Sequence, residues 1–147
     1  MYRRTAAALV LAAGLLVSGC AADQAAAPDD GADPTACVRT AQCPSLTPDR
    51  FAQLVAADDV VVVDVRTPEE FAAGHLAGAV NLDVTAPGFA DAVTDLDPDG
   101  VYALYCRTGN RSRTAAQLMA ELGVTATADL TGGIEAWSQS GRAVTTD

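Results

Sequence analysis

The chain of 147 residues is predicted to form one α/β domain, in which a parallel sheet is flanked by helices on both faces. The first observation behind this class is the alternation of strand-like and helix-like segments along the chain. The second is the run Val101–Tyr105, which is apolar at every position, as is typical of a strand buried on both faces. Half of the residues are hydrophobic, and roughly 100 residues are enough to bury one core.

Hydrophobic periodicity and the turn residues between segments justify the individual elements. Thr47 can cap a helix that has Pro48 at its first position. A turn of Asp, Pro and Gly residues at 97–100 separates a helix from the apolar strand, and Gly123 can end the next helix in the left-handed conformation. In chain order we expect a helix from Pro48, a strand over 60–65, a short helix over 68–73, a strand over 79–82, a helix over 89–96, the strand Val101–Tyr105, a helix from Arg113, a strand over 127–130 and a helix from Gly133.

Residues 106–112, with the sequence CRTGNRS, join the apolar strand to the following helix. In a parallel sheet such a loop lies at the carboxyl edge, where ligands bind. Backbone N–H groups and the positive end of a helix dipole favour an anion there, and Arg107 and Arg111 add two charges. These surroundings lower the pKa of a thiol from its usual value of about 8.5, so Cys106 is predicted to be a thiolate nucleophile. The alternative is an inert, buried cysteine at a strand end.

Three blocks of sequence resemble signatures of the rhodanese family of sulfurtransferases, and they occur in the family's order. The first is DVRTPEEFAAGHLAGAVNL at residues 64–82, the second is the loop that begins at Cys106, and the third is LTGGIEAW at residues 130–137. The resemblance covers roughly residues 45–147. It implies the rhodanese-like α/β fold and sulfurtransferase activity.

The resemblance implies that Cys106 attacks the outer sulfur of thiosulfate or a similar small anionic donor, releases sulfite and keeps one sulfur as a persulfide. A thiol or cyanide then takes that sulfur, and no cofactor is implied. Asp64 and Arg66 are expected to support the loops at the same sheet edge, unless they form only an exposed ion pair. The residues expected to bind the donor are those of the loop: Arg107, Thr108, Gly109, Asn110 and Arg111.

Other functions compete with this interpretation. A persulfide carrier for a protein partner outside the cytoplasm would share the first step, whereas a non-catalytic rhodanese-like binding module would not need an intact Cys106. Tyrosine and dual-specificity phosphatases also use a cysteine loop, but with one residue more between cysteine and arginine than the four that separate Cys106 from Arg111. A phosphatase is therefore a distant alternative.

The single histidine, His75, lies in a predicted turn between Gly74 and Gly78. A serine or cysteine protease dyad would have to use this histidine. In the family signature the corresponding residue is mainly structural, and we expect the same role here. One histidine also excludes a histidine-rich metal site, so no metal is predicted.

The N-terminus has the layout of a signal peptide, because two arginines precede the apolar run 6–17, which is too short to span a bilayer. Residues 17–20 read Val-Ser-Gly-Cys and resemble a bacterial lipobox. Residues 1–19 are therefore predicted to be the signal peptide and Cys20 the lipidated first residue, which would anchor the protein to the bacterial membrane outside the cytoplasm. An ordinary secretory signal that contains a cysteine is the alternative.

Residues 20–44 are rich in Ala, Asp, Pro and Gly without apolar periodicity, and they are predicted to be a flexible tether to the domain at residues 45–147. Cys37 and Cys43 lie near the end of this tether. In an exported protein, two such cysteines predict a disulfide that closes a small loop. The alternative is a redox pair that accepts sulfur from Cys106 or resolves its persulfide.

The formal net charge is −10, and without the two N-terminal arginines the remaining seven arginines face 19 acidic residues, which gives −12. An acidic protein is a poor match for nucleic acid or for anionic membrane surfaces. The expected partners are therefore a small sulfur donor, its acceptor and the membrane through the lipid anchor, with the protein itself a monomer. The positive loop is a local exception in this negative field.

Overall fold

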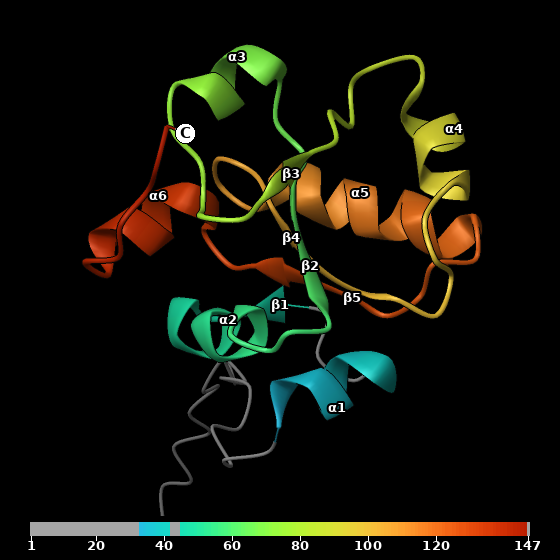
Figure 1. The fold of residues 1–147 in the computed structure, drawn as a ribbon, viewed down its shortest axis with the longest axis horizontal. Coiled ribbons are helices and arrows are strands. Elements are labelled where there is room, and N and C mark those ends of the chain that lie inside the picture. Colours follow the sequence, from blue (N-terminus) through green and yellow to red (C-terminus); the bar gives the residue numbers. More distant parts are fainter. Residues whose placement is uncertain (1–32, 42–44, 147) are drawn as a thin grey trace, which may run out of the picture. The chain divides into compact units, whose positions relative to one another are not determined.

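The computed structural model describes residues 33–41 and 45–146, which form a five-stranded sheet with helices around it (Figure 1). The strands are β1 (Ser45–Leu46), β2 (Val60–Asp64), β3 (Val80–Asn81), β4 (Val101–Tyr105) and β5 (Thr127–Leu130). The helices are α1 (Pro34–Arg39), α2 (Pro48–Val55), α3 (Pro68–Ala72), α4 (Phe89–Thr94), α5 (Asn110–Glu121) and α6 (Gly133–Gln139). All strand pairs are parallel, in the order β1-β5-β4-β2-β3. The predicted α/β class is confirmed.

The side chains of β4 alternate between the two faces of the sheet, as the pleat of a strand requires. Odd-numbered residues of β4 belong to the core on the side of α1 and α2, and even-numbered residues belong to the core beneath α4 and α5. Figure 1 shows these two helix pairs on opposite sides of the sheet. Cys106 follows directly after β4, continues the even-numbered set and is buried with it. The alternation therefore directs the thiol toward α5.

The elements predicted from Pro48 onward are all found, with bounds shifted by a few residues. The largest shift is in α5, which begins at Asn110 and not at Arg113, because Gly109 turns the chain into the helix with a left-handed backbone, φ 95°. Arg111 and Ser112 consequently lie in the first helical turn. The strand β1 was not predicted, since two residues are too few to show a period.

The helix α1 lies inside the segment predicted to be a flexible tether, so that prediction is wrong for this part of the chain. Asp33 caps the helix by accepting a hydrogen bond of 2.9 Å from the Thr35 backbone N–H, and Pro34 suits the first helical turn. Val38 is fully buried in the core that α2 also covers. A single buried apolar side chain in a polar segment shows no periodicity. The ordered domain therefore begins before the predicted boundary at residue 45.

Several predictions concern positions outside the described residues, namely the signal peptide at 1–19, Cys20 and Cys43. Cys37 is described and is disulfide-bonded. This agrees with the disulfide predicted for it, while Cys43 as its partner stays a prediction. Among the helices within 33–41 and 45–146, none has the length and apolar character that crossing a membrane requires.

Candidate active site

The loop between β4 and α5 places the sulfur of Cys106 at the N-terminus of the helix. Gly109 adopts its left-handed backbone without steric cost because it has no side chain. Its N–H donates a hydrogen bond to Cys106 Sγ over 3.1 Å. The Ser112 hydroxyl, in the first turn of α5, donates to the same sulfur over 3.7 Å. A backbone N–H of the loop, the kind of donor predicted to favour an anion there, therefore does reach the thiol.

The pKa of Cys106 results from opposing effects. Only 1% of the residue is exposed, and this burial raises the pKa of the thiol. Hydrogen bonds from the backbone and hydroxyl of Ser112 and from the N–H groups of Thr108 and Gly109 outweigh burial, so the pKa lies below its ordinary value. The direction agrees with the sequence prediction. The donors that cause it are the uncharged backbone and hydroxyl groups, of which the backbone N–H groups were predicted, whereas the predicted charges of Arg107 and Arg111 are not among the main causes.

Ser112 is a site residue that the sequence analysis did not single out. Besides its contact with the sulfur, its hydroxyl lies 3.1 Å from the Gly109 carbonyl oxygen, so it ties the loop to the first helical turn. A signal was present in the sequence. Ser112 shares the buried stripe of α5 with Ala115 and Met119, and a polar side chain on such a stripe needs a hydrogen-bond partner.

The start of α6 supports the loop from its other side. The N–H groups of Ile134 and Glu135 donate to the carbonyl oxygens of Cys106 and Arg107 over 2.9 and 3.3 Å. Gly133 has φ 60°, and a Cβ atom built there would overlap with both of these carbonyl oxygens. Only glycine permits this close approach. Gly133 of the third sequence block therefore has a defined structural purpose.

The two arginines expected to bind the donor each have a carboxylate partner. Arg111 Nη1 and Nη2 donate to Glu70 Oε2 and Oε1 over 2.6 and 2.7 Å. Arg107 Nε donates to Glu135 Oε1 over 2.7 Å. The partners lie 41 and 28 residues away along the chain, too far for a local pattern to indicate either pairing. The hydrogen bond from Arg111 lowers the pKa of Glu70 to about 2. The charges of these two arginines are thus balanced in pairs.

The remaining loop residues, Thr108 and Asn110, are exposed. Asn110 Oδ1 accepts a hydrogen bond of 2.7 Å from Arg113 Nη2, and Arg113 Nε donates to the Gly109 carbonyl oxygen over 3.2 Å. Asn110 therefore helps to hold Arg113 against the loop. Thr108 contributes its backbone N–H to the thiol.

Asp64 and Arg66 form a buried ion pair at the carboxyl end of β2, with 0% and 6% of the two residues exposed. The Arg66 backbone N–H and Nε both donate to Asp64 Oδ1 over 2.9 Å. Arg66 Nη2 also donates to the Gly74 carbonyl oxygen over 2.6 Å. The side chain of Asn81 donates to the carbonyl oxygens of Asp64 and Arg66. The alternative of an exposed pair is excluded, and the pair joins β2 to the segment after α3.

The family model of the rhodanese-like domain matches residues 47–140, which include the Cys106 loop and the carboxylate partners of both loop arginines. The chain belongs to the rhodanese-like family. Among curated proteins it is similar to the thiosulfate sulfurtransferase GlpE of Pseudomonas putida, at 35% identity over 92 residues, which cover 63% of this chain and 82% of that protein.

Solved structures show the same rhodanese-like fold. A rhodanese-related protein from Thermoplasma volcanium matches with a TM-score of 0.62 and 28% identity, over 70% of this chain and 98% of that one. The human single-domain sulfurtransferase TSTD1 matches with a TM-score of 0.57 and 25% identity, over 66% of this chain and 96% of that one. The chain is therefore a rhodanese-like sulfurtransferase.

His75 of this rhodanese-like domain is buried, with 4% of the residue exposed. Its ring stacks on Phe71 with 3.8 Å between ring centroids, and its Nδ1 lies 3.0 Å from the Phe71 carbonyl oxygen. Its backbone pairs with Thr145 near the C-terminus. These contacts agree with the predicted structural role and join α3 to the end of the chain.

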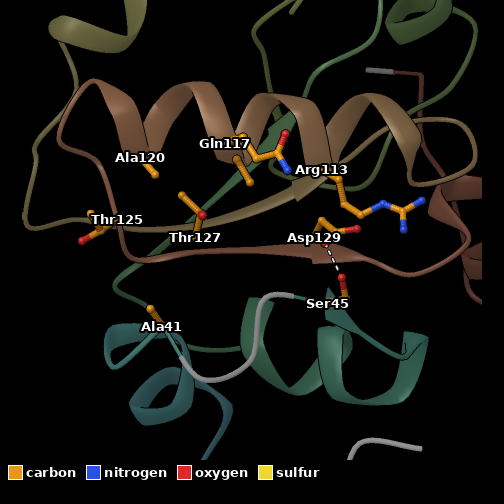
Figure 2. A pocket seen from close by; sticks show the side chains of 9 residues that line it. Ala41, Ser45, Arg113, Gln117, Ala120, Thr125, Thr127 and Asp129 are labelled. Carbon is orange, nitrogen blue, oxygen red and sulfur yellow. Dashed lines mark hydrogen bonds between the residues drawn. The ribbon is translucent and has the colours of Figure 1, made fainter. Parts of the chain in front are cut away.

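A cavity of about 340 Å³ lies between α5 and β5, and Cys106 is not among the residues that line it. Figure 2 shows Asp129 hydrogen-bonded to Ser45 near Arg113 at one end of this cavity. Burial raises the pKa of Asp129. The cavity is thus separate from the thiol, and in this rhodanese-like domain the chemistry centres on the loop.

Proposed function

We propose that this rhodanese-like enzyme transfers a sulfane sulfur from thiosulfate, or a similar small anionic donor, to a thiol or cyanide. The observation that carries the proposal is the free thiol of Cys106, whose sulfur accepts hydrogen bonds from Gly109 and Ser112 at the N-terminus of α5. The similar protein of Pseudomonas putida bears the name thiosulfate sulfurtransferase, which supports this choice of donor.

The proposed transfer consists of two displacements. In the first, the Cys106 thiolate attacks the outer sulfur of thiosulfate. A new S–S bond forms, the S–S bond of the donor breaks, and sulfite leaves with the electron pair. In the second, an acceptor thiolate or cyanide attacks the outer sulfur of the persulfide, and Cys106 leaves as a thiolate. The N–H groups of Thr108, Gly109 and Ser112, which already favour the thiolate, stabilise negative charge on sulfur in both steps.

The burial of Cys106 favours a donor whose transferable sulfur is terminal and unbranched. Because only 1% of the residue is exposed, a bulky reacting centre does not reach the thiol while the loop keeps this conformation. The outer sulfur of thiosulfate projects as a single atom from the rest of the ion. A terminal persulfide sulfur has the same shape.

Steady-state turnover of thiosulfate with cyanide tests the proposal. The wild-type protein is expected to release thiocyanate and sulfite with ping-pong kinetics, and Cys106→Ser is expected to release neither. Absence of thiocyanate from the wild-type protein, or undiminished release from the variant, contradicts the proposal. A persulfide that forms but is removed by neither cyanide nor small thiols favours the carrier alternative.

We also infer that the protein is exported and anchored by a lipid on Cys20. The layout of residues 1–20 supports this location, and the disulfide bond of Cys37 suits an oxidising compartment. Growth of the producing bacterium with an alkyne-labelled fatty acid is expected to label the wild-type protein but not Cys20→Ser. Label that persists in the variant contradicts the anchor.

A further inference from the structure

The pair of Arg111 and Glu70 lies at the first turn of α5, the helix whose N-terminus holds the reacting sulfur. Both terminal nitrogens of the guanidinium are occupied by the two carboxylate oxygens of Glu70, at 2.6 and 2.7 Å. The pKa of Arg111 is raised first by Glu70 and, to a smaller extent, by the charge on Cys106. Arg111 stands in the first turn of α5 directly before Ser112, whose hydroxyl lies 3.7 Å from Cys106 Sγ, but its paired N–H groups point to Glu70.

Glu70 is fixed in position by its own helix. It forms a capping box with Thr67, in which each residue's side chain accepts a hydrogen bond of 3.4 Å from the other's backbone N–H. Its pKa of about 2 keeps it ionised at any pH at which the thiol reacts. The carboxylate of Glu70 therefore stays negatively charged and is held against Arg111 by its own helix.

A dianionic donor that approaches the end of the guanidinium must replace this anion, because bidentate binding of an oxyanion there uses the same Nη1 and Nη2 groups that Glu70 occupies. Both side chains are about one-third exposed, 31% for Arg111 and 32% for Glu70, so the exchange can occur without unfolding the site. The pair of Arg107 and Glu135 is more exposed, 68% and 45%, and solvent screens it more strongly.

We propose that Glu70 competes with dianionic donors for Arg111 and thereby shifts the donor preference of the site toward monoanionic persulfides. This inference rests on the proposed function, since it concerns the donor of the same reaction. A monoanionic persulfide carries its charge on the terminal sulfur, which the loop N–H groups receive. When the Cys106 thiolate attacks that sulfur, a new S–S bond forms, and the donor's own thiolate leaves with the electron pair of the broken bond. Such a donor does not need Arg111.

The variant Glu70→Gln tests the competition while keeping the shape of the side chain. Glutamine can serve in a capping box, so α3 is retained, and a thermal midpoint close to that of the wild type verifies this. The KM for thiosulfate is expected to fall about tenfold, as one charge-assisted contact becomes available. The ratio of kcat/KM for thiosulfate to kcat/KM for cysteine persulfide is expected to rise by a similar factor.

Two comparisons make the result specific. Asp49→Asn removes the same amount of negative charge and breaks the surface pair of Asp49 with Arg142, so it should leave both KM values unchanged. In the background of Arg111→Gln, the further change Glu70→Gln should no longer lower the KM for thiosulfate.

A KM for thiosulfate that is unchanged or higher in Glu70→Gln, with an active wild-type protein, overturns the inference and would make Glu70 a residue that positions Arg111. An inactive wild-type protein instead overturns the proposed function.

Discussion

At the scale of single residues, the sulfur of Cys106 is held mainly by groups without a net charge. The Gly109 N–H donates to it and the Ser112 hydroxyl lies within hydrogen-bond distance of it, and both groups are in place before any donor arrives. Fixed dipoles of this kind stabilise developing charge without a reorganisation cost. Cys106 and its loop were predictable because the thiol, the glycine and the arginines stand together in the sequence. Glu70 and Glu135 were not, because their partners become neighbours only after folding.

Ser112→Ala tests the contribution of the hydroxyl. The variant loses one hydrogen bond to the thiolate, so the pKa of Cys106 is expected to rise and the thiolate to form only at higher pH. Since a hydrogen bond to a charged group contributes about 1.5 kcal/mol, turnover should fall roughly tenfold at pH values below the pKa of the thiol and recover as the pH is raised. The rate of alkylation by iodoacetamide against pH measures this shift. A profile that superimposes on that of the wild type contradicts the assigned contribution.

At the scale of elements, the loop is built by three of them. β4 delivers the thiol, α5 supplies the donors, and α6 binds the loop carbonyl oxygens through Ile134 and Glu135. The strand β4 was predicted with its observed bounds, because a strand buried on both faces is apolar throughout. β5 was also predicted with its observed bounds, although Thr127 and Asp129 make it polar at alternate positions. The start of α5 was placed too late, since Arg111 and Ser112 are polar and resemble loop residues. α1 and β1 were missed because each has too few apolar residues to show a period.

Gly133→Ala tests the support that α6 gives to the loop. Its Cβ would meet the carbonyl oxygens of Cys106 and Arg107, so we expect a loss of about 3 kcal/mol in the free energy of unfolding, from backbone strain and overlap together. Gly78→Ala is the matched control: its φ of 74° is also left-handed, but nothing lies within 4 Å of a Cβ there. It should lose only about 1 kcal/mol. Equal losses in urea unfolding would falsify the assigned overlap.

At the scale of the whole molecule, the site lies at the carboxyl edge of the rhodanese-like sheet, which is where parallel sheets bind their ligands. The formal net charge of −10 opposes the approach of an anion. The loop was predicted to carry a local positive charge within this negative protein, but the carboxylates of Glu70 and Glu135 balance the charges of its two arginines. The two arginines therefore do not give the loop a broad positive surface.

The disulfide bond of Cys37 bears on the stability of the whole domain, because Cys37 lies in α1 and this helix packs on the core at the start of the domain. Replacing Cys37 and Cys43 together with serine is expected to lower the free energy of unfolding by about 2 kcal/mol, as for a short closed loop, and to leave turnover with cyanide intact. Urea unfolding and the thiocyanate assay measure the two quantities. Lost turnover with unchanged stability would instead favour a sulfur relay through these cysteines.

Sulfur transfer through this loop requires that Cys106 carries the transferred sulfur. Intact-protein mass spectrometry after incubation with thiosulfate measures it most directly. We predict a mass increase of one sulfur atom on the wild-type protein, which cyanide removes and which Cys106→Ala never acquires. A wild-type mass that stays unchanged, or the same increase in the variant, would contradict the account.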